Sequence, residues 1–333
     1  YHNNSDSGTA INFPIQKMLN SYDMIAVTTG AGDTSNKLGI PGENLPHVMD
    51  SLQITGWYNS HPYYLKNGPL ELKTRPDVSK IKNVVIIGLG NVALDVARIF
   101  SMSPDNANLS YSDIDPEVYE QLKSSSVENI YVVGRRGPLA FKGTRKELKE
   151  LRERPSDMAN ISVLDDFYDI DDHDATIDKS IFVDDVELDK MKRAARKDLT
   201  KRGSFRTYAY LRDVPRCDKN SATKPINKDY QPKNDYQRSD NDDAYEKYLA
   251  KKPRHCQFRF HRTPTKITEN SIHLKVTHPA AAGDENQTTE EILPADLIVI
   301  CTGNKTSGWE NIVEYSKNGI ADFSDNFNDQ KID

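Results

Sequence analysis

The sequence predicts an α/β fold built on a parallel sheet, with a small antiparallel sheet added to it. Residues 81–87 form a β-branched run that stops at Gly88, and apolar residues then recur at the helical spacings of three and four. A second apolar run covers 130–133, which completes the strand–helix–strand order of a parallel, doubly wound sheet. Two alternating runs, 257–262 and 271–277, are typical of antiparallel strands.

Local signals mark further elements along the chain. Residues 22–28 predict a short buried strand that ends in a glycine turn. Asp115 followed by Pro116 predicts the start of a short helix, because Asp caps a helix and Pro suits its first position. Residues 297–301 predict a strand that returns to the parallel core, and the polar stretch 218–252 predicts a surface insertion.

Length and composition narrow the class of protein. The 333 residues suggest about two domains, and 44 basic against 50 acidic side chains give a net charge of −6. No apolar run reaches the roughly 20 residues of a transmembrane helix. Three scattered cysteines without a Cys-x-x-Cys pair predict neither a disulfide framework nor a metal site, and favour a reducing compartment. The sequence starts at Tyr1 without a leader pattern, so we expect any targeting segment to precede it.

The turn after the first core strand fits the dinucleotide fingerprint G-x-G-x-x-G/A. In this pattern the first glycine permits the turn, the second lets the backbone approach a pyrophosphate, and the third small residue lets the helix pack close to the strand. The N–H groups of the following helix then point at the phosphates. The alternative is a glycine turn without a ligand. The candidate residues are Gly88, Leu89, Gly90, Asn91, Val92 and Ala93.

Charged residues beyond this loop predict which nucleotide it takes. Arg135 and Arg136 follow the second core strand, where an NAD site usually offers an acidic residue, so the pair predicts a 2′-phosphate and hence NADP. The alternative is a solvated basic turn. Thr144 and Glu147 fit a capping box, so Glu147 has two compatible roles, as a cap or as a contact to the adenosine ribose. Asp95 is expected to act on the dipole of the nucleotide helix.

Two further features allow more than one interpretation. Trp57 is either a stacking platform for a flat cofactor or a core residue. A basic helical stretch follows the acidic tract 165–189 and is either a solvated face or a docking site for an acidic protein. Nucleic acid is not expected as a partner, because no aromatic interleaving or known module accompanies the charge. The basic residues are Lys192, Arg193, Arg196 and Lys197.

Several motifs, in order and spacing, resemble the adrenodoxin reductase family, the mitochondrial-type NADPH:ferredoxin oxidoreductases. They are Thr29-Gly30-Ala31, Ile40-Pro41-Gly42-Glu43, Gly56-Trp57-Tyr58-Asn59, the stretch from Gly90 to Arg98, and Val133 to Leu139. The resemblance implies a Rossmann-like NADP-binding domain of the two-dinucleotide-binding flavoprotein type, inserted in an FAD-binding domain. It implies residues 1–55 as the end of the FAD domain and a linker, 56–300 as the NADP domain, and 301–333 as the return to the FAD domain.

The family's activity gives the functional expectation. Hydride passes from NADPH to FAD, and single electrons then pass to a [2Fe-2S] ferredoxin, an acidic partner for the four basic residues above. The resemblance implies cofactor contacts at the glycine loop, the arginine pair, Glu147, Gly30 and Trp57, and no catalytic side chain. It also implies a mitochondrial matrix location, in solution or peripherally on the inner membrane.

Two departures from the family's pattern temper this expectation. Its N-terminal FAD glycine motif and its C-terminal Gly-Trp segment are not found between Tyr1 and Asp333, so we expect the FAD site to lie largely outside this chain. The alternatives are a glutamate-synthase-like flavoprotein electron donor and a non-catalytic NADP-binding module. Reduction of a ferredoxin by NADPH distinguishes the first hypothesis from both.

Overall fold

The computed structural model describes part of the chain and divides it into two compact units. One unit comprises residues 37–302 and the other residues 1–36 with 303–333. The described residues are 17–18, 20–26, 34–62, 76–102, 109, 112, 114–153, 160–164, 185–197, 199–212, 214, 216–217, 254–278, 286–305, 314–315 and 321–322.

The unit of residues 37–302 is built on a seven-stranded sheet in which all neighbouring strands run parallel. The predicted unit of strand, helix and strand is confirmed as β3, α3 (Asn91–Ser101) and β4. In spatial order the strands are β2 (Val48–Asp50), β11 (Leu297–Ile300), β3 (Asn83–Ile87), β4 (Asn129–Val133), β7 (His255–Arg259), β5 (Asn160–Leu164) and β6 (Arg216–Cys217).

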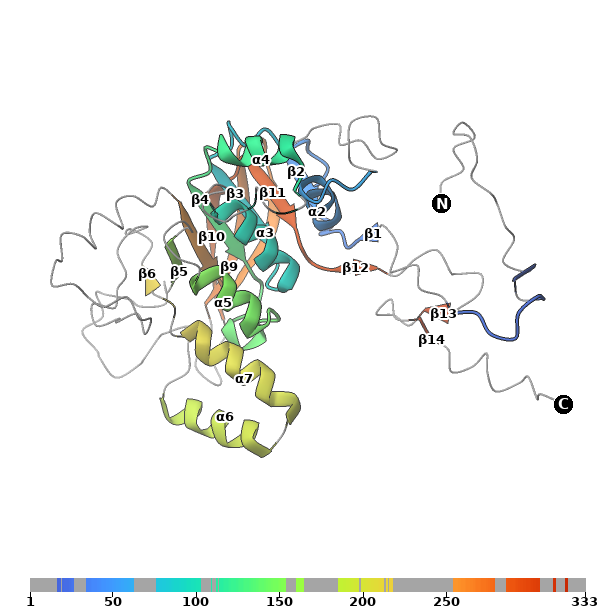
Figure 1. The fold of residues 1–333 in the computed structure, drawn as a ribbon. Coiled ribbons are helices and arrows are strands. Elements are labelled where there is room, and N and C mark those ends of the chain that lie inside the picture. The colour runs from blue at the N-terminus through green and yellow to red at the C-terminus, as the bar shows by residue number, and fades with distance from the viewer. Residues whose placement is uncertain are drawn as a thin grey trace. The chain divides into compact units, whose positions relative to one another are not determined.

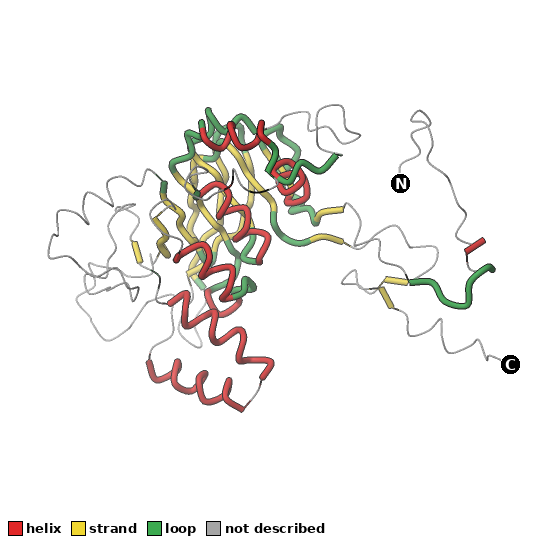
Figure 2. Tube along the Cα trace, in the orientation of Figure 1, coloured by secondary structure: helices red, strands yellow, loops and turns green. Residues whose placement is uncertain are grey.

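Helices cover one face of this sheet (Figure 1). Apolar side chains from five helices meet buried strand residues such as Val84, Ile86 and Phe258 in one core. A further helix, α6 (Asp185–Lys197), packs against α7, and Figure 2 shows the two side by side. The five helices are α2 (Ser51–Tyr58), α3, α4 (Pro116–Lys123), α5 (Arg145–Glu153) and α7 (Leu199–Arg212).

A three-stranded antiparallel sheet covers the other face. Its strands are β8 (Arg262–Ile267), β9 (Ser271–His278) and β10 (Gln287–Pro294), in the order β10-β9-β8. Ile272 and Leu274 of this sheet pack on Val85 and Ile298 of the parallel sheet in a second core. The predicted α/β fold with a small antiparallel sheet is therefore confirmed.

The alternating run 257–262 differs from its prediction as one antiparallel strand. Residues 255–259 form β7 in the parallel sheet, and the antiparallel strand β8 begins at Arg262. His261 lies between them with φ 59°, a left-handed conformation that turns the chain from one sheet to the other.

Local helix signals predicted α4 well. The Asp115 side chain accepts hydrogen bonds from the N–H groups of Glu117 (2.8 Å) and Val118 (3.3 Å), and Pro116 is the first helical residue. Within the described residues, none of the helices combines the length and the apolar character needed to span a bilayer.

The other unit holds two short strand pairs. β1 (Thr34–Ser35) pairs with β12 (Asn304–Lys305), and β13 (Glu314–Tyr315) pairs with β14 (Ala321–Asp322). The strand predicted at 22–28 was wrong over 22–26, because no described strand pairs with this segment, and Tyr22 and Met24 are 65% and 87% exposed. Residues 27–28 lie outside the described part.

The unit boundary also differs from the predicted division at residues 55 and 300. β2 joins the parallel sheet through β11, and α2 contributes Ile54, Trp57 and Tyr58 to the helix-side core. Residues 37–55 therefore belong with the sheet, and the unit extends from 37 to 302.

Candidate nucleotide-binding site

The loop after β3 is shaped by its first glycine. Gly88 has φ 143°, and a Cβ atom there would lie 2.3 Å from the carbonyl oxygen of Cys301. Its N–H donates to the Val133 carbonyl at 2.9 Å. The residue must therefore be glycine for β3 to end between its neighbours β11 and β4.

The second glycine faces open space. A Cβ atom on Gly90 would meet no atom of the described residues within 4 Å, and Gly90 is the N-cap of α3 with no capping side chain among them. Ala93 is fully buried, so the helix lies close to the sheet, and Val92 is 45% exposed. The uncapped first turn and the empty space above Gly90 fit a pyrophosphate.

The loop is fixed to the segment before α5. The Leu89 carbonyl accepts hydrogen bonds from the N–H groups of Lys142 (3.1 Å) and Gly143 (2.8 Å). The Leu89 side chain lies over Gly134, where a Cβ atom would come within 2.1 Å of Leu89 Cδ1. Glycine at position 134 thus lets the glycine loop after β3 pack on the turn that follows β4.

The arginine pair lies in that turn, directly after β4 and before the 3-10 helix η2 (Pro138–Ala140). β3 and β4 are parallel neighbours, with Ile87 opposite Val133, so the glycine loop and the pair follow adjacent strand ends. Arg135 and Arg136 are both exposed. Among the described residues neither has an ion-pair partner, which leaves two guanidinium groups for an anion.

The capping box predicted at α5 forms only in half. Thr144 Oγ1 accepts the N–H of Glu147 at 3.4 Å. The N–H of Thr144, which a full box would give to Glu147, instead donates to Asn91 Oδ1 at 2.7 Å. Glu147 is half-exposed, and its carboxylate has no hydrogen bond or ion pair among the described residues.

A polar network behind the loop was missed by sequence reasoning. Tyr58 donates to Asp95 Oδ2 at 2.7 Å, Asp95 pairs with Arg98, and Arg98 Nη1 pairs with Glu150 at 2.7 Å. These contacts join α2, α3 and α5. Asp95 is the fifth residue of α3, in its second turn, and its carboxylate contacts Tyr58 and Arg98, so its expected action on the helix dipole stays a prediction.

Burial decides between the two interpretations of Trp57. The side chain is 2% exposed and lies in the helix-side core, and its Nε1 atom has no hydrogen-bond partner within the described residues. This placement favours the core role, since the ring offers no exposed face for stacking.

The four predicted basic residues share one surface of α6. Leu188, Met191 and Ala195 of this helix pack toward the core, whereas Lys192, Arg193, Arg196 and Lys197 are all exposed. Within the described residues none of the four has an acidic partner. In the part of the chain that the structure describes, these four side chains therefore form a positive surface on α6.

The remaining predicted features lie elsewhere or outside the described part. Gly30, residues 165–184 of the acidic tract and the insertion 218–252 fall on residues that the structure does not describe. The described residues hold no cluster of three or more His, Cys, Asp or Glu side chains suited to a metal ion.

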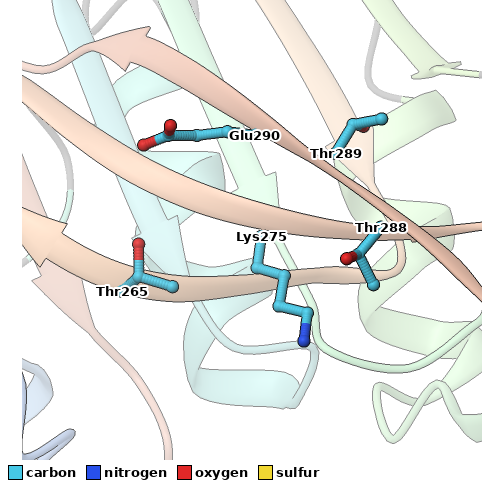
Figure 3. A pocket seen from close by; sticks show the side chains of 5 residues that line it. All are labelled: Thr265, Lys275, Thr288, Thr289 and Glu290. Atoms are coloured by element: carbon cyan, nitrogen blue, oxygen red, sulfur yellow. The ribbon is translucent and has the colours of Figure 1, made fainter.

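A hollow of about 290 Å³ lies on the antiparallel sheet (Figure 3). Lys275 and Glu290 face each other in the strand register, yet Figure 3 shows their charged ends pointing apart. Glu290 pairs with His273 Nδ1 instead, at 2.8 Å. The exposed lining residues are Thr265, Lys275, Thr288, Thr289 and Glu290.

Comparison with known proteins points to one group of enzymes, although no protein-family model matches the chain. Over 149 residues it is 40% identical to the probable NADPH:adrenodoxin oxidoreductase of Schizosaccharomyces pombe, a match that covers 44% of this chain and 29% of that protein. The bovine (Bos taurus) NADPH:adrenodoxin oxidoreductase is 40% identical over 141 residues, covering 42% of this chain and 26% of the enzyme. The matched stretch thus spans less than a third of the length of these curated relatives.

Solved structures agree with this comparison over more of the chain. A histidine-to-glutamine variant of FprA from Mycobacterium tuberculosis matches with a TM-score of 0.58 at 26% identity, covering 90% of this chain and 54% of FprA. FprA in complex with NADPH matches with a TM-score of 0.56 at 25% identity, with the same coverage. The resemblance to the adrenodoxin reductase family is therefore confirmed, as is the fold it implied.

Proposed function

We propose, from this similarity to the adrenodoxin reductase family, that the chain carries mainly the NADP-binding part of an FAD-dependent NADPH:ferredoxin oxidoreductase. The observation that supports the proposal most is the open glycine loop beside Arg135 and Arg136, which have no ion-pair partner among the described residues. Both lie at the carboxyl ends of two adjacent parallel strands. In open α/β sheets, ligands bind outside the carboxyl ends of the parallel strands.

Each part of the site has a role in holding the nucleotide. The N–H groups of the first turn of α3, beside Gly90, bind the pyrophosphate. Arg135 and Arg136 bind the 2′-phosphate and so distinguish NADP from NAD. The Glu147 carboxylate accepts a hydrogen bond from a hydroxyl of the adenosine ribose.

The redox chemistry belongs to the cofactors. When bound, NADPH would supply a hydride to FAD, and the flavin would supply single electrons to a ferredoxin. The protein's residues bind and orient, so no side-chain nucleophile is required. Gly30 and the unit of residues 1–36 with 303–333 are assigned to the FAD-binding part by resemblance alone.

The basic surface of α6 is the proposed docking site for the ferredoxin. Four exposed cations without acidic partners in the described residues attract an acidic protein and speed its association. Following the family, we assign the partner a [2Fe-2S] cluster. Replacing Lys192 and Arg193 by Glu in the intact parent protein should raise the KM for ferredoxin and flatten its salt dependence, while NADPH oxidation with a small-molecule acceptor is unchanged.

The proposed location is the mitochondrial matrix or the matrix face of the inner membrane. The S. pombe and bovine relatives are named mitochondrial proteins, whereas FprA is a mycobacterial protein. Fractionation of the source cells tests this part of the proposal.

Calorimetric titration of the chain with NADP⁺ and NAD⁺ at fixed salt tests the nucleotide site. We expect a clear preference for NADP⁺. Gly90→Ala should abolish binding of both nucleotides, since its Cβ would occupy the space meant for the phosphate, and should change stability by less than about 1 kcal/mol. Binding of neither nucleotide to the wild-type chain would contradict the proposed site. Failure of the intact parent protein to reduce a ferredoxin with NADPH would contradict the activity.

A further inference from the structure

We propose that Asn91 is a positioning residue that keeps Glu147 available to a bound nucleotide. Its side chain accepts the N–H of Thr144 and thereby excludes the Glu147 carboxylate from the capping box of α5. The nucleotide contact of Glu147 rests on the proposed function, whereas the exclusion from the box does not.

Another helix of the molecule shows what a complete box looks like. At α2, Asp50 Oδ1 accepts the N–H of Gln53 and Gln53 Oε1 accepts the N–H of Asp50, both at 2.9 Å. At α5 the first bond is present, from the N–H of Glu147 to Thr144 Oγ1. The second donor is taken by Asn91, a residue 53 positions earlier in the chain.

The hydrogen bond from the Thr144 N–H to Asn91 is one of several contacts between the glycine loop and the start of α5. Two further hydrogen bonds, to the Leu89 carbonyl from the N–H groups of Lys142 and Gly143, fix the same segment. Leu89 and Asn91 flank Gly90, the residue that faces open space. The backbone that is to hold the pyrophosphate therefore also sets the start of α5.

The middle of α5 is also joined to α3, the helix that follows the glycine loop. Arg98 of α3 pairs with Glu150, one turn after Glu147. Contacts to α3 therefore fix α5 both before Glu147, at Thr144, and after it, at Glu150. The Glu147 carboxylate itself has no partner among the described residues. A carboxylate is an acceptor only, so it suits a sugar hydroxyl and not a phosphate.

Amide hydrogen exchange at Thr144 tests the exclusion without any nucleotide. In Asn91→Ala the freed N–H should pass to Glu147, so its exchange should stay close to the wild-type rate, as it should in Glu147→Ala. In the double variant no acceptor remains, and exchange should speed up roughly tenfold. Equally fast exchange in Asn91→Ala and in the double variant would show that Glu147 does not enter the box, and would overturn the proposal.

Nucleotide titration tests the consequence for binding. In the wild-type background Glu147→Ala should weaken NADP⁺ and NAD⁺ alike, by roughly tenfold for the lost charged hydrogen bond. In the Asn91→Ala background the same change should have no further effect, because the carboxylate already caps α5. In the Asn91→Asp background, which keeps an acceptor for Thr144, the loss should return.

The two outcomes that oppose the proposals are distinguishable. Losses that multiply in the double variant Asn91→Ala/Glu147→Ala would show that the residues act independently, and would overturn the positioning role. Absence of nucleotide binding to the wild-type chain would contradict the proposed function, and the exchange experiment would still decide whether Asn91 excludes Glu147. Circular dichroism of each variant checks that it is folded.

Discussion

The Tyr58 hydroxyl donates a 2.7 Å hydrogen bond to the Asp95 carboxylate and thereby joins α2 to α3. Burial first, and the neighbouring Asp95 second, raise the pKa of Tyr58. A phenol whose folded pKa lies above its unfolded value adds stability that is present at neutral pH and is lost as the pH rises past about 10.

We therefore expect Tyr58→Phe to lower the free energy of unfolding at pH 7 by about 1.5 kcal/mol, the worth of a hydrogen bond to a charged group. Between pH 9 and 11 the wild-type protein should lose stability more steeply than the variant, by up to roughly 1.4 kcal/mol per pH unit. Urea denaturation across this range measures both effects. Tyr22→Phe, a change at an exposed phenol, is the control and should alter neither; parallel pH curves for wild type and Tyr58→Phe would contradict the assignment.

The arginine pair gives a prediction on nucleotide choice. Arg135→Ala and Arg136→Ala should each weaken NADP⁺ by about 1.5 to 3 kcal/mol, because each removes a charged hydrogen bond to the 2′-phosphate. Affinity for NAD⁺ should change little. Lys82→Ala, at an exposed cation that precedes β3, serves as the control. Equal losses for both nucleotides in calorimetry would rule out the 2′-phosphate role.

Glu291 gives a prediction on stability. Its carboxylate pairs with Arg259 of β7, and with Arg262 of β8 at 2.9 Å, and the Arg262 side chain is fully buried. Glu291→Ala should lower the free energy of unfolding by about 3 to 5 kcal/mol, since it breaks two ion pairs that are largely buried. The adjacent Glu290→Ala, at an exposed carboxylate, should cost less than about 1 kcal/mol. Chemical denaturation of the two variants compares them directly, and similar losses would contradict the role of Glu291.

Ser60 gives a prediction of increased stability. It follows the C-cap of α2 with φ 57°, and the N–H groups of Ser60 and His61 donate to the carbonyls of Trp57 (3.3 Å) and Gly56 (2.9 Å), the pattern of a Schellman motif. Its buried Oγ has no partner within the described residues. Ser60→Gly should raise the free energy of unfolding by about 0.5 to 1 kcal/mol by relieving the left-handed strain. Thermal unfolding measures the gain; Ser60→Ala retains the strain and should not reproduce it.

The parts of the fold that could be predicted from the sequence depend on residues that are close to one another along the chain. Spacing within 81–100 gave β3 and α3, and Asp115 with Pro116 gave the start of α4, because caps and periodicity act within one or two turns. The glycine fingerprint and the arginine pair were found in the same way, from positions directly after strands.

The parts that sequence did not predict depend on distant partners. Thr144 and Glu147 carry the full signature of a capping box, yet Asn91 enters it from another loop. Likewise the segment 257–262 alternates as an antiparallel strand does. Its first part nevertheless belongs to β7, which pairs in parallel with β4 and β5. Neither outcome has a local sequence signal, because each depends on contacts with residues that are distant in the sequence.

The spatial order of the strands has a consequence for protein synthesis. β11 lies between β2 and β3, and β7 lies between β4 and β5, although both are translated after the strands they separate. While the ribosome is still short of residue 300, β2 and β3 have open edges toward each other, and open strand edges invite pairing with other chains. We therefore expect the nascent protein to be most exposed to aggregation before β11, its last inner strand, has been translated.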